Sequence, residues 1–258
     1  MRMNVKVLGS SGAELPGYNS SAFLVDGKVL LDAGTIGTAL GESKQWEVRH
    51  ILITHAHLDH IKSIPFLADN IVINQRKHSV TLYGTKETLK ILRDNLLNDK
   101  LWPDFTKISA SIDPVLKMKT IVPGRPFIVN GYSATAYPVS HTVPAVGYVL
   151  RNGRGRTLLY TGDTGPTQKI WASSDRINVM IIEVSFPNSM EELAIKTGHL
   201  TPDLIGVEID KMKRLPEKIL ITHIKPQYMV RIRKELQKIK KKKQVAIQII
   251  KDGRTYKV

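Results

Sequence analysis

Hydrophobic residues along the chain form short aliphatic or alternating runs, which predict β-strands, and longer stretches with helical spacing. Near the N-terminus, NVKVLG is followed by SAFLVDGKVLLDAG, where Asp26-Gly27 between two apolar runs predicts a β-hairpin. Similar runs predict further strands at 50–54, 79–84, 125–130, 132–140, 146–152, 156–163, 177–186 and 218–223.

Helices are predicted between these strands, at 58–67, 85–99, 201–214 and 228–243. Thr201 is expected to cap the third of them, and Asn188 to cap a further helix with Glu191 three residues later. The chain thus has two halves, and two sheets packed face to face with helices outside would bury the aliphatic strands. We therefore predict an α+β fold, a four-layer αββα sandwich of two mixed sheets with helices on the outer faces, formed by residues 1–258 as a single domain.

The composition limits the chemistry that the chain can perform. Among its 258 residues, 42% are hydrophobic and 24% charged, as in ordinary globular proteins. No apolar stretch approaches the roughly 20 residues that span a bilayer, so no membrane partner is expected. No signal peptide is visible, and a cytoplasmic location is expected. There is no cysteine, so any metal ion must be held by imidazole, carboxylate and water.

The formal net charge of +15 makes the surface attractive to phosphates and nucleic acids. The densest basic run, Lys234–Gln244, is interpreted as the exposed end of a helix, where lysines complement the helix dipole. A role in RNA binding or in steering phosphates stays open as an alternative for this run.

Three histidines and an aspartate are crowded into THAHLDH, directly after the strand at 50–54. His55 and His57 are two residues apart and point the same way from extended backbone. Asp59 and His60 follow where the chain turns into a helix, so one loop can offer two sets of ligands. Two metal ions about 3.5–4 Å apart need such an arrangement.

Three later polar residues, His141, Asp163 and His223, also follow strands directly, which suggests that they join the same site. In the hypothesis that results, His55, His57 and His141 hold one metal ion, Asp59, His60 and His223 hold a second, and Asp163 bridges the two. The histidines outside this pattern, His50 and His78, are interpreted as structural.

The motif THAHLDH resembles the HxHxDH signature of the metallo-β-lactamase superfamily, and His141, Asp163 and His223 match the order and type of that family's remaining ligands. Four more strings resemble the class II cyclic-nucleotide phosphodiesterases: GSSGAELPGYNSSAFLVD, LWPDF, GHLTP and THIKP. The resemblance implies hydrolysis of 3′,5′-cAMP or cGMP to the 5′-monophosphate by a water activated between two divalent metal ions. Zinc is the expected metal, with manganese or iron as alternatives, and a homodimer is expected from the relatives.

Transfer-RNA 3′-processing endonucleases of the same superfamily are the main alternative. They have a similar Gly-His-Ser-Thr stretch, but Leu200 stands here in place of their serine, and no long Gly/Pro-rich insertion is present. The high positive charge, in contrast, favours an RNA substrate. A metal-free binding module is disfavoured by the intact set of ligands, and a β-lactam or thioester hydrolase would not explain His199.

His199 lies just before a predicted helix N-terminus and is the candidate to protonate the leaving oxygen, with capping of the helix as the alternative. Asp59 is expected to act in catalysis as well as in metal binding. Side chains that could recognise the base, although core packing explains them equally well, are Tyr18, Asn19, Trp102, Phe105, Phe186, Asn188 and Tyr228.

Overall fold

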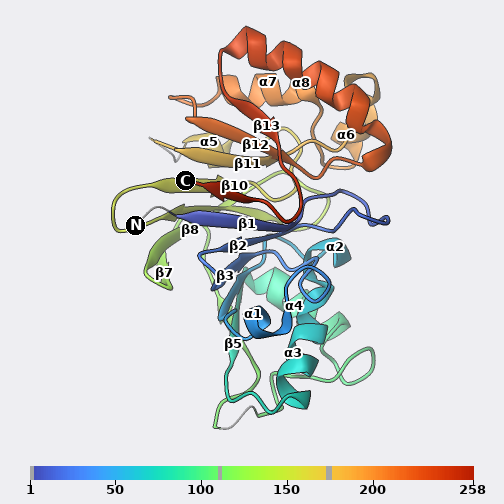
Figure 1. Ribbon diagram of the computed structural model, residues 1–258. Coiled ribbons are helices and arrows are strands. Elements are labelled where there is room, and N and C mark those ends of the chain that lie inside the picture. Colours follow the sequence, from blue (N-terminus) through green and yellow to red (C-terminus); the bar gives the residue numbers. More distant parts are fainter. Residues whose placement is uncertain (1–2, 110–111, 173–175) are drawn as a thin grey trace.

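The computed structural model describes residues 3–109, 112–172 and 176–258, which form two seven-stranded sheets lying face to face (Figure 1). The first sheet has the order β14-β1-β2-β3-β4-β5-β6. Its strands from β1 to β3 pair antiparallel, whereas those from β3 to β6 pair parallel. Their bounds are β1 (Asn4–Gly9), β2 (Ala22–Val25), β3 (Val29–Leu31), β4 (His50–Leu52), β5 (Val80–Gly84), β6 (Leu116–Thr120) and β14 (Thr255–Lys257).

The second sheet has the order β13-β12-β11-β10-β9-β8-β7 and is also mixed. The strands from β7 to β10 pair antiparallel, and those from β10 to β13 pair parallel. Their bounds are β7 (Phe127–Val129), β8 (Tyr132–Pro138), β9 (Val146–Arg151), β10 (Thr157–Tyr160), β11 (Val179–Glu183), β12 (Lys218–Thr222) and β13 (Ile247–Ile249).

Helices cover the outer faces of both sheets, so the predicted αββα sandwich is confirmed (Figure 1). On the first sheet lie α1 (Glu42–Gln45), α2 (Leu58–Ile61), α3 (Ser63–Ile73) and α4 (Lys86–Asn95); on the second lie α5 (Lys169–Ala172), α6 (Glu191–Lys196), α7 (Pro202–Asp210) and α8 (Met229–Lys243), with two 3₁₀ turns, η1 (Asn188–Met190) and η2 (Pro226–Tyr228). One buried cluster fills the space between the sheets, and one lies under each helical layer. That residues 1–258 form a single domain stays a prediction.

Several local predictions can be compared with the structure. The hairpin between β2 and β3 is confirmed, and Asp26 and Gly27 both have the positive φ that a tight two-residue turn requires (44° and 73°). Thr201 caps α7 as predicted, accepting a hydrogen bond from the Leu204 amide at 3.3 Å. The cap at Asn188 was wrong, because the Asn188 side chain accepts from the Asp203 amide in the first turn of α7 instead.

The single helix predicted at 58–67 was also wrong. Two helices, α2 and α3, occupy this region and meet at Lys62. The break occurs because the Ser63 amide donates to the Ala33 carbonyl at 3.0 Å, outside the α2 pattern, while Ser63 Oγ donates to the Gly34 carbonyl. These bonds tie the start of α3 to the chain that follows β3.

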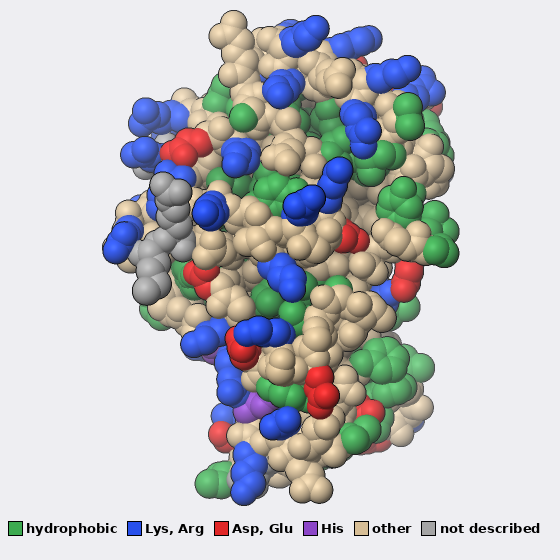
Figure 2. Space-filling view, in the orientation of Figure 1, with side chains coloured by type: hydrophobic (Ala, Val, Ile, Leu, Met, Phe, Trp, Pro, Cys, Tyr) green, Lys and Arg blue, Asp and Glu red, His purple; other side chains and the backbone are tan. Residues whose placement is uncertain are grey.

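The basic run at the end of α8 is exposed, as predicted, except that Lys243 is partly buried and pairs with Asp210. Figure 2 shows that Lys and Arg side chains are spread over much of one face of the molecule, α8 included. None of the described helices has both the length and the apolar character that crossing a membrane requires.

Candidate metal centre

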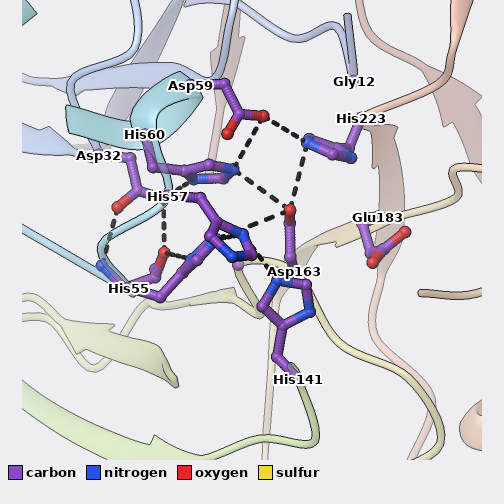
Figure 3. Close-up of polar contacts among 12 residues, drawn as sticks. Gly12, Asp32, His55, His57, Asp59, His60, His141, Asp163, Glu183 and His223 are labelled. Atoms are coloured by element: carbon purple, nitrogen blue, oxygen red, sulfur yellow. Dashed lines mark hydrogen bonds and ion pairs between the residues drawn. The ribbon is translucent and has the colours of Figure 1, made fainter. Parts of the chain in front are cut away.

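The seven predicted ligands lie together at one edge of the sandwich, between the two sheets (Figure 3). The first sheet contributes four of them, from the loop after β4 and the first turn of α2, and the second contributes three, each just after β8, β10 or β12. Because the carboxyl ends of parallel strands meet at one edge, residues more than a hundred positions apart converge here. The structure therefore brings the seven side chains close together, and their role as metal ligands stays a prediction.

One group consists of His55, His57 and His141. His57 Nδ1 lies 3.1 Å from His55 Nε2 and 3.1 Å from His141 Nε2. Zinc–nitrogen bonds of about 2.0–2.1 Å in a tetrahedron place neighbouring ligand atoms about 3.3 Å apart. The spacing of these three nitrogens therefore suits a shared metal ion.

The second group consists of Asp59, His60, Asp163 and His223. Asp163 Oδ2 lies 3.3 Å from His60 Nε2 and 3.2 Å from His223 Nε2. Asp59 Oδ2 lies 3.3 Å from the same His223 nitrogen. The Asp163 oxygen is also 3.9 Å from His55 Nε2 in the first group, so it occupies the position of a shared ligand.

Four of the five imidazoles are fixed by hydrogen bonds from the ring nitrogen that faces away from the cluster. His60 Nδ1 donates to Asp32 Oδ2 at 2.7 Å, and His141 Nδ1 donates to the Gly198 carbonyl at 2.8 Å. His55 Nδ1 and His223 Nδ1 lie 3.0 Å and 2.9 Å from the hydroxyls of Thr54 and Ser185. Ligand histidines are held in this way in metalloproteins, because the outer bond leaves the inner nitrogen free for the metal.

A buried ring nitrogen supports the same conclusion. His60 Nε2 makes no hydrogen bond to any described residue, although the side chain is fully buried and Asp163 Oδ2 is close. A buried polar atom without a partner is costly, and a metal ion between His60 and Asp163 would remove that cost. The donor set, nitrogen and oxygen only, fits zinc, manganese or iron. That these residues bind metal, and how many ions, stays a prediction.

The pKa shifts of His55, His57 and Asp163 favour the protonation states that metal ligands need. Burial lowers the pKa of His55 well below its ordinary value and also lowers that of His57. Burial alone would raise the pKa of Asp163, but His223 and His60 beside it hold that pKa well below its usual range. Neutral imidazoles and an ionised carboxylate are the forms that coordinate a cation.

His60 shows that the second group carries excess negative charge. Burial opposes a charge on its ring, yet the carboxylates of Asp163 and Asp32 raise the pKa of His60 well above the ordinary value. A bound cation would compensate the same carboxylates.

His199 lies beside this cluster, as predicted, with its ring centroid 5.2 Å from that of His141 and 5.4 Å from that of His223. Its Nδ1 donates to Glu183 Oε1 at 2.6 Å. Burial opposes a charge on His199, but Glu183 and Asp163 raise its pKa above the ordinary value. His199 does not cap α7, because Thr201 does.

Two buried carboxylates at the site, Asp32 and Glu183, were missed in the sequence. Asp32 follows β3 and accepts from His60, Thr54 and Tyr160, and Glu183 ends β11 and accepts from His199. Both carry the signal used for the other residues, a polar side chain at the end of an aliphatic strand. Applied to every predicted strand, that pattern would have identified both carboxylates.

The remaining predictions for individual side chains have mixed outcomes. Glu183, His199 and His223 form a third cluster of possible ligands beside the two groups, and His50 and His78 lie outside all three, as expected for structural residues. Of the proposed base-stacking aromatics, Phe186 lies near the site, 5.9 Å from the His199 ring, and Tyr228 lies 6.2 Å from Phe186. Phe105 is buried in the core beneath the first helical layer.

The other candidates for base recognition lie in different surroundings. Trp102 packs partly buried against the same core and contacts Phe66 at 5.1 Å. Tyr18 is 38% exposed and lines a cavity beneath α8. Asn19 and Asn188 are tied by hydrogen bonds, Asn19 to Asp252 and the Leu8 carbonyl, Asn188 to Asp203 and Glu235.

Comparison with known proteins adds independent findings. A family model described as a beta-lactamase superfamily domain matches residues 28–224. A probable 3′,5′-cyclic-nucleotide phosphodiesterase of Yersinia pestis is 26% identical over 208 residues, which cover 70% of this chain and 58% of that protein, so the match spans less than two thirds of that relative. A ribonuclease Z of Methanococcus maripaludis is also 26% identical, over 88% of this chain and 89% of its own length.

Among solved structures, unliganded yeast PDE1 superposes with a TM-score of 0.83 over 100% of this chain and 99% of its own, at 16% sequence identity. At that identity the match concerns the fold alone. The sequence relatives carry two different names, and their printed activities differ in substrate.

Proposed function

Because this chain belongs to the metallo-β-lactamase superfamily, we propose that it is a metal-dependent hydrolase that converts 3′,5′-cyclic nucleotides, cAMP or cGMP, to 5′-monophosphates. The observation that carries the proposal is the pairing of His199 with Glu183 directly beside the two groups of possible metal ligands. Such a pair provides a proton donor next to the place where a phosphodiester would be held. Zinc as the metal, a homodimer and a cytoplasmic location stay predictions.

The seven side chains His55, His57, Asp59, His60, His141, Asp163 and His223 would hold two divalent ions. When bound, such ions lower the pKa of water and neutralise phosphoryl oxygens. Asp163 would be shared, because its Oδ2 is the oxygen that approaches both groups. Asp59 is the more exposed carboxylate, at 38% against 4% for Asp163, so it can also accept a hydrogen bond from an attacking water.

His199 would act on the leaving group. Water attacks phosphorus, the bond from phosphorus to the 3′-oxygen breaks, and that oxygen needs a proton. Glu183 fixes the Nδ1 side of His199 and raises its pKa, so the Nε2 side can hold a proton and donate it. Positioned acid catalysis of this kind contributes about 10²–10⁴-fold in rate.

Lys225 and Phe186 would contact the rest of the substrate. The Lys225 ammonium lies 5.3 Å from the Phe186 ring centroid and donates to the Gly12 carbonyl at 3.1 Å. Both are close to His199, since Phe186 contacts its ring and the Lys225 charge acts on its pKa. A cation suits the phosphate, and an aromatic ring suits the base.

Processing of RNA 3′ ends is the second candidate. The net charge of +15 favours a polyanionic substrate, and several sequence relatives are named ribonuclease Z. The two candidates share the metal centre and differ only in substrate.

The test is a substrate panel. Purified protein loaded with zinc or manganese is incubated separately with 3′,5′-cAMP, 3′,5′-cGMP and a precursor tRNA with a 3′ extension, and products are resolved by chromatography and gel. We expect 5′-AMP or 5′-GMP and intact RNA. Cleaved RNA with unchanged cyclic nucleotides would move the function to RNA processing, and turnover of none of them would contradict both candidates.

Two variants serve as controls for the panel. Asp163→Ala should abolish turnover, because both groups of ligands lose the oxygen that they share. His50→Ala changes a histidine outside the clusters and should leave turnover intact.

A further inference from the structure

A cavity of about 620 Å³ opens beneath α8, between that helix, strands β12 and β13 and the loop that follows β1. Figure 2 shows it as a hollow with apolar side chains on its floor and basic side chains around its margin. Its volume is within the range of about 300–1,000 Å³ that is typical of small-molecule sites. None of the seven candidate metal ligands lines it, so it is separate from the metal centre.

The floor of the cavity is aliphatic. It is formed by Ile221, Ile224, Leu236, Ile247, Ile249 and Ile250. The one aromatic residue among the lining is Tyr18, from the loop that follows β1. A flat, polar base would find neither a pair of stacking rings nor a set of polar groups on this floor, whereas a hydrocarbon chain would be matched by it.

The margin of the cavity is cationic. Arg233 and Lys240 are seven residues apart on α8 and therefore on the same side of the helix, and Lys251 follows β13. All three are exposed, and their side chains make no hydrogen bond or ion pair with any described residue. The only acidic lining residue, Asp252, is already engaged, because its two oxygens accept from Ser10 Oγ at 2.7 Å and the Asn19 amide at 3.1 Å. Free positive charge thus surrounds an apolar floor.

We propose that this cavity binds a single-chain amphiphile with an anionic head, of the fatty-acid class. The chain lies on the isoleucine floor, and the carboxylate lies at the margin between α8 and Lys251. Burial of the chain removes apolar surface from water, which tightens binding about fourfold for each CH₂ group. The carboxylate gains charge-assisted contacts with Arg233 and Lys240.

One hydrogen bond links the lining of the cavity to the backbone of a candidate metal ligand. Ser10 lines it, and the Ser10 carbonyl accepts a hydrogen bond from the His223 amide at 2.7 Å. Binding itself needs no metal, because the lining contains no candidate ligand. A binding measurement on metal-free protein therefore tests this site independently of the proposed enzyme activity.

The experiment is isothermal titration calorimetry of the metal-free full chain with octanoate and decanoate, below micellar concentrations. We expect one site per chain and binding of decanoate about 16-fold tighter than octanoate, from two added CH₂ groups. Decyltrimethylammonium, with the same chain and the opposite charge, should bind more weakly. Absence of decanoate binding, or equal affinity for both head groups, would overturn the proposal.

Matched variants locate the site. Arg233→Gln with Lys240→Gln should weaken decanoate about tenfold, and Gln237→Trp should fill the cavity and abolish binding. The control, Lys234→Gln with Lys241→Gln, removes the same charge from α8 outside the lining and should leave affinity unchanged. An equal loss in the control would refute the location.

Two other occupants would also overturn the proposal. Adenosine monophosphate bound at this site in place of decanoate would make it a nucleotide site. A concentration-dependent dimer that is broken by Gln237→Trp would make it an interface, and sedimentation velocity would detect it.

Discussion

Replacing Asp32 by asparagine removes the negative charge that orients His60 without changing the shape of the side chain. Asp32 is fully buried and has a φ of 56°, a conformation that asparagine tolerates. Its Oδ1 accepts from the Thr54 amide at 2.8 Å. Its Oδ2 accepts from Thr54 Oγ1, His60 Nδ1 and Tyr160 Oη, at 2.8, 2.7 and 2.7 Å.

The magnitude follows from these four bonds. The asparagine oxygen would take the Oδ2 position, where it keeps three bonds, and its amide group would face the Thr54 amide, donor against donor. The Thr54 N–H left without an acceptor costs about 1–3 kcal/mol, and the other three bonds each weaken by about 1 kcal/mol when the acceptor is neutral. The N–H groups of the new amide are buried without acceptors as well, so we expect Asp32→Asn to lower the free energy of unfolding by at least about 4–6 kcal/mol.

Metal binding should weaken as well. Loss of the carboxylate that orients a ligand histidine typically lowers metal affinity about 10–100-fold. Urea denaturation of the metal-free protein and competition with a chromophoric chelator measure the two effects separately. Asp26→Asn is the control, since Asp26 also has a positive φ (44°) but lies outside the possible metal-binding groups. An Asp32→Asn variant with the stability and metal affinity of the parent would refute the reasoning.

Three further predictions follow from the site and its surroundings. His199→Ala should lower kcat about 10²–10⁴-fold with metal content unchanged, as measured by steady-state kinetics. Full turnover by this variant would contradict the role of His199 as proton donor. Gly12→Ala should displace His223 and lower the metal content of the protein, because an added Cβ would lie 2.3 Å from the His223 carbonyl oxygen. The control Gly37→Ala, which has open space around its added Cβ, should keep the metal content of the parent. Equal metal content in the two variants would contradict this prediction. Burial, Arg49 and Arg76 lower the pKa of His78 to about 4, below its unfolded value of about 6.5, so the folded state disfavours its charge and loses stability as pH falls from about 6.5 to about 4. Urea titrations at several pH values should show that the free energy of unfolding of His78→Gln depends less on pH than that of the parent. The same pH dependence in both proteins would contradict the role given to His78.

The sequence predicted the fold and the grouping of the site for one physical reason. Aliphatic strands that end in a polar residue place that residue at the edge of a sheet, and four such ends supplied the pattern for His55, His141, Asp163 and His223. Spacing within THAHLDH then indicated two groups of ligands from one loop. Both inferences need only local geometry.

Hydrogen bonds between distant segments were not accessible in the same way. Asn188 has the residue type and spacing of a cap for its own helix, yet its side chain accepts from Asp203, fifteen residues later. The choice depends on how α7 packs, which no local pattern contains. Asp32 and Glu183 could have been identified as strand-end residues, but their pairing with His60 and His199 could not, because it depends on how each sheet packs against the segments that cover it.

The measurement that tests the central claim most directly is a titration of metal-free protein with Zn²⁺ while the conversion of 3′,5′-cAMP to 5′-AMP is followed. The arrangement of the ligands around Asp163 predicts that two equivalents bind per chain and that turnover appears as the second is filled. Full turnover without metal, or a chain that binds two equivalents and leaves every cyclic nucleotide unchanged, would contradict it.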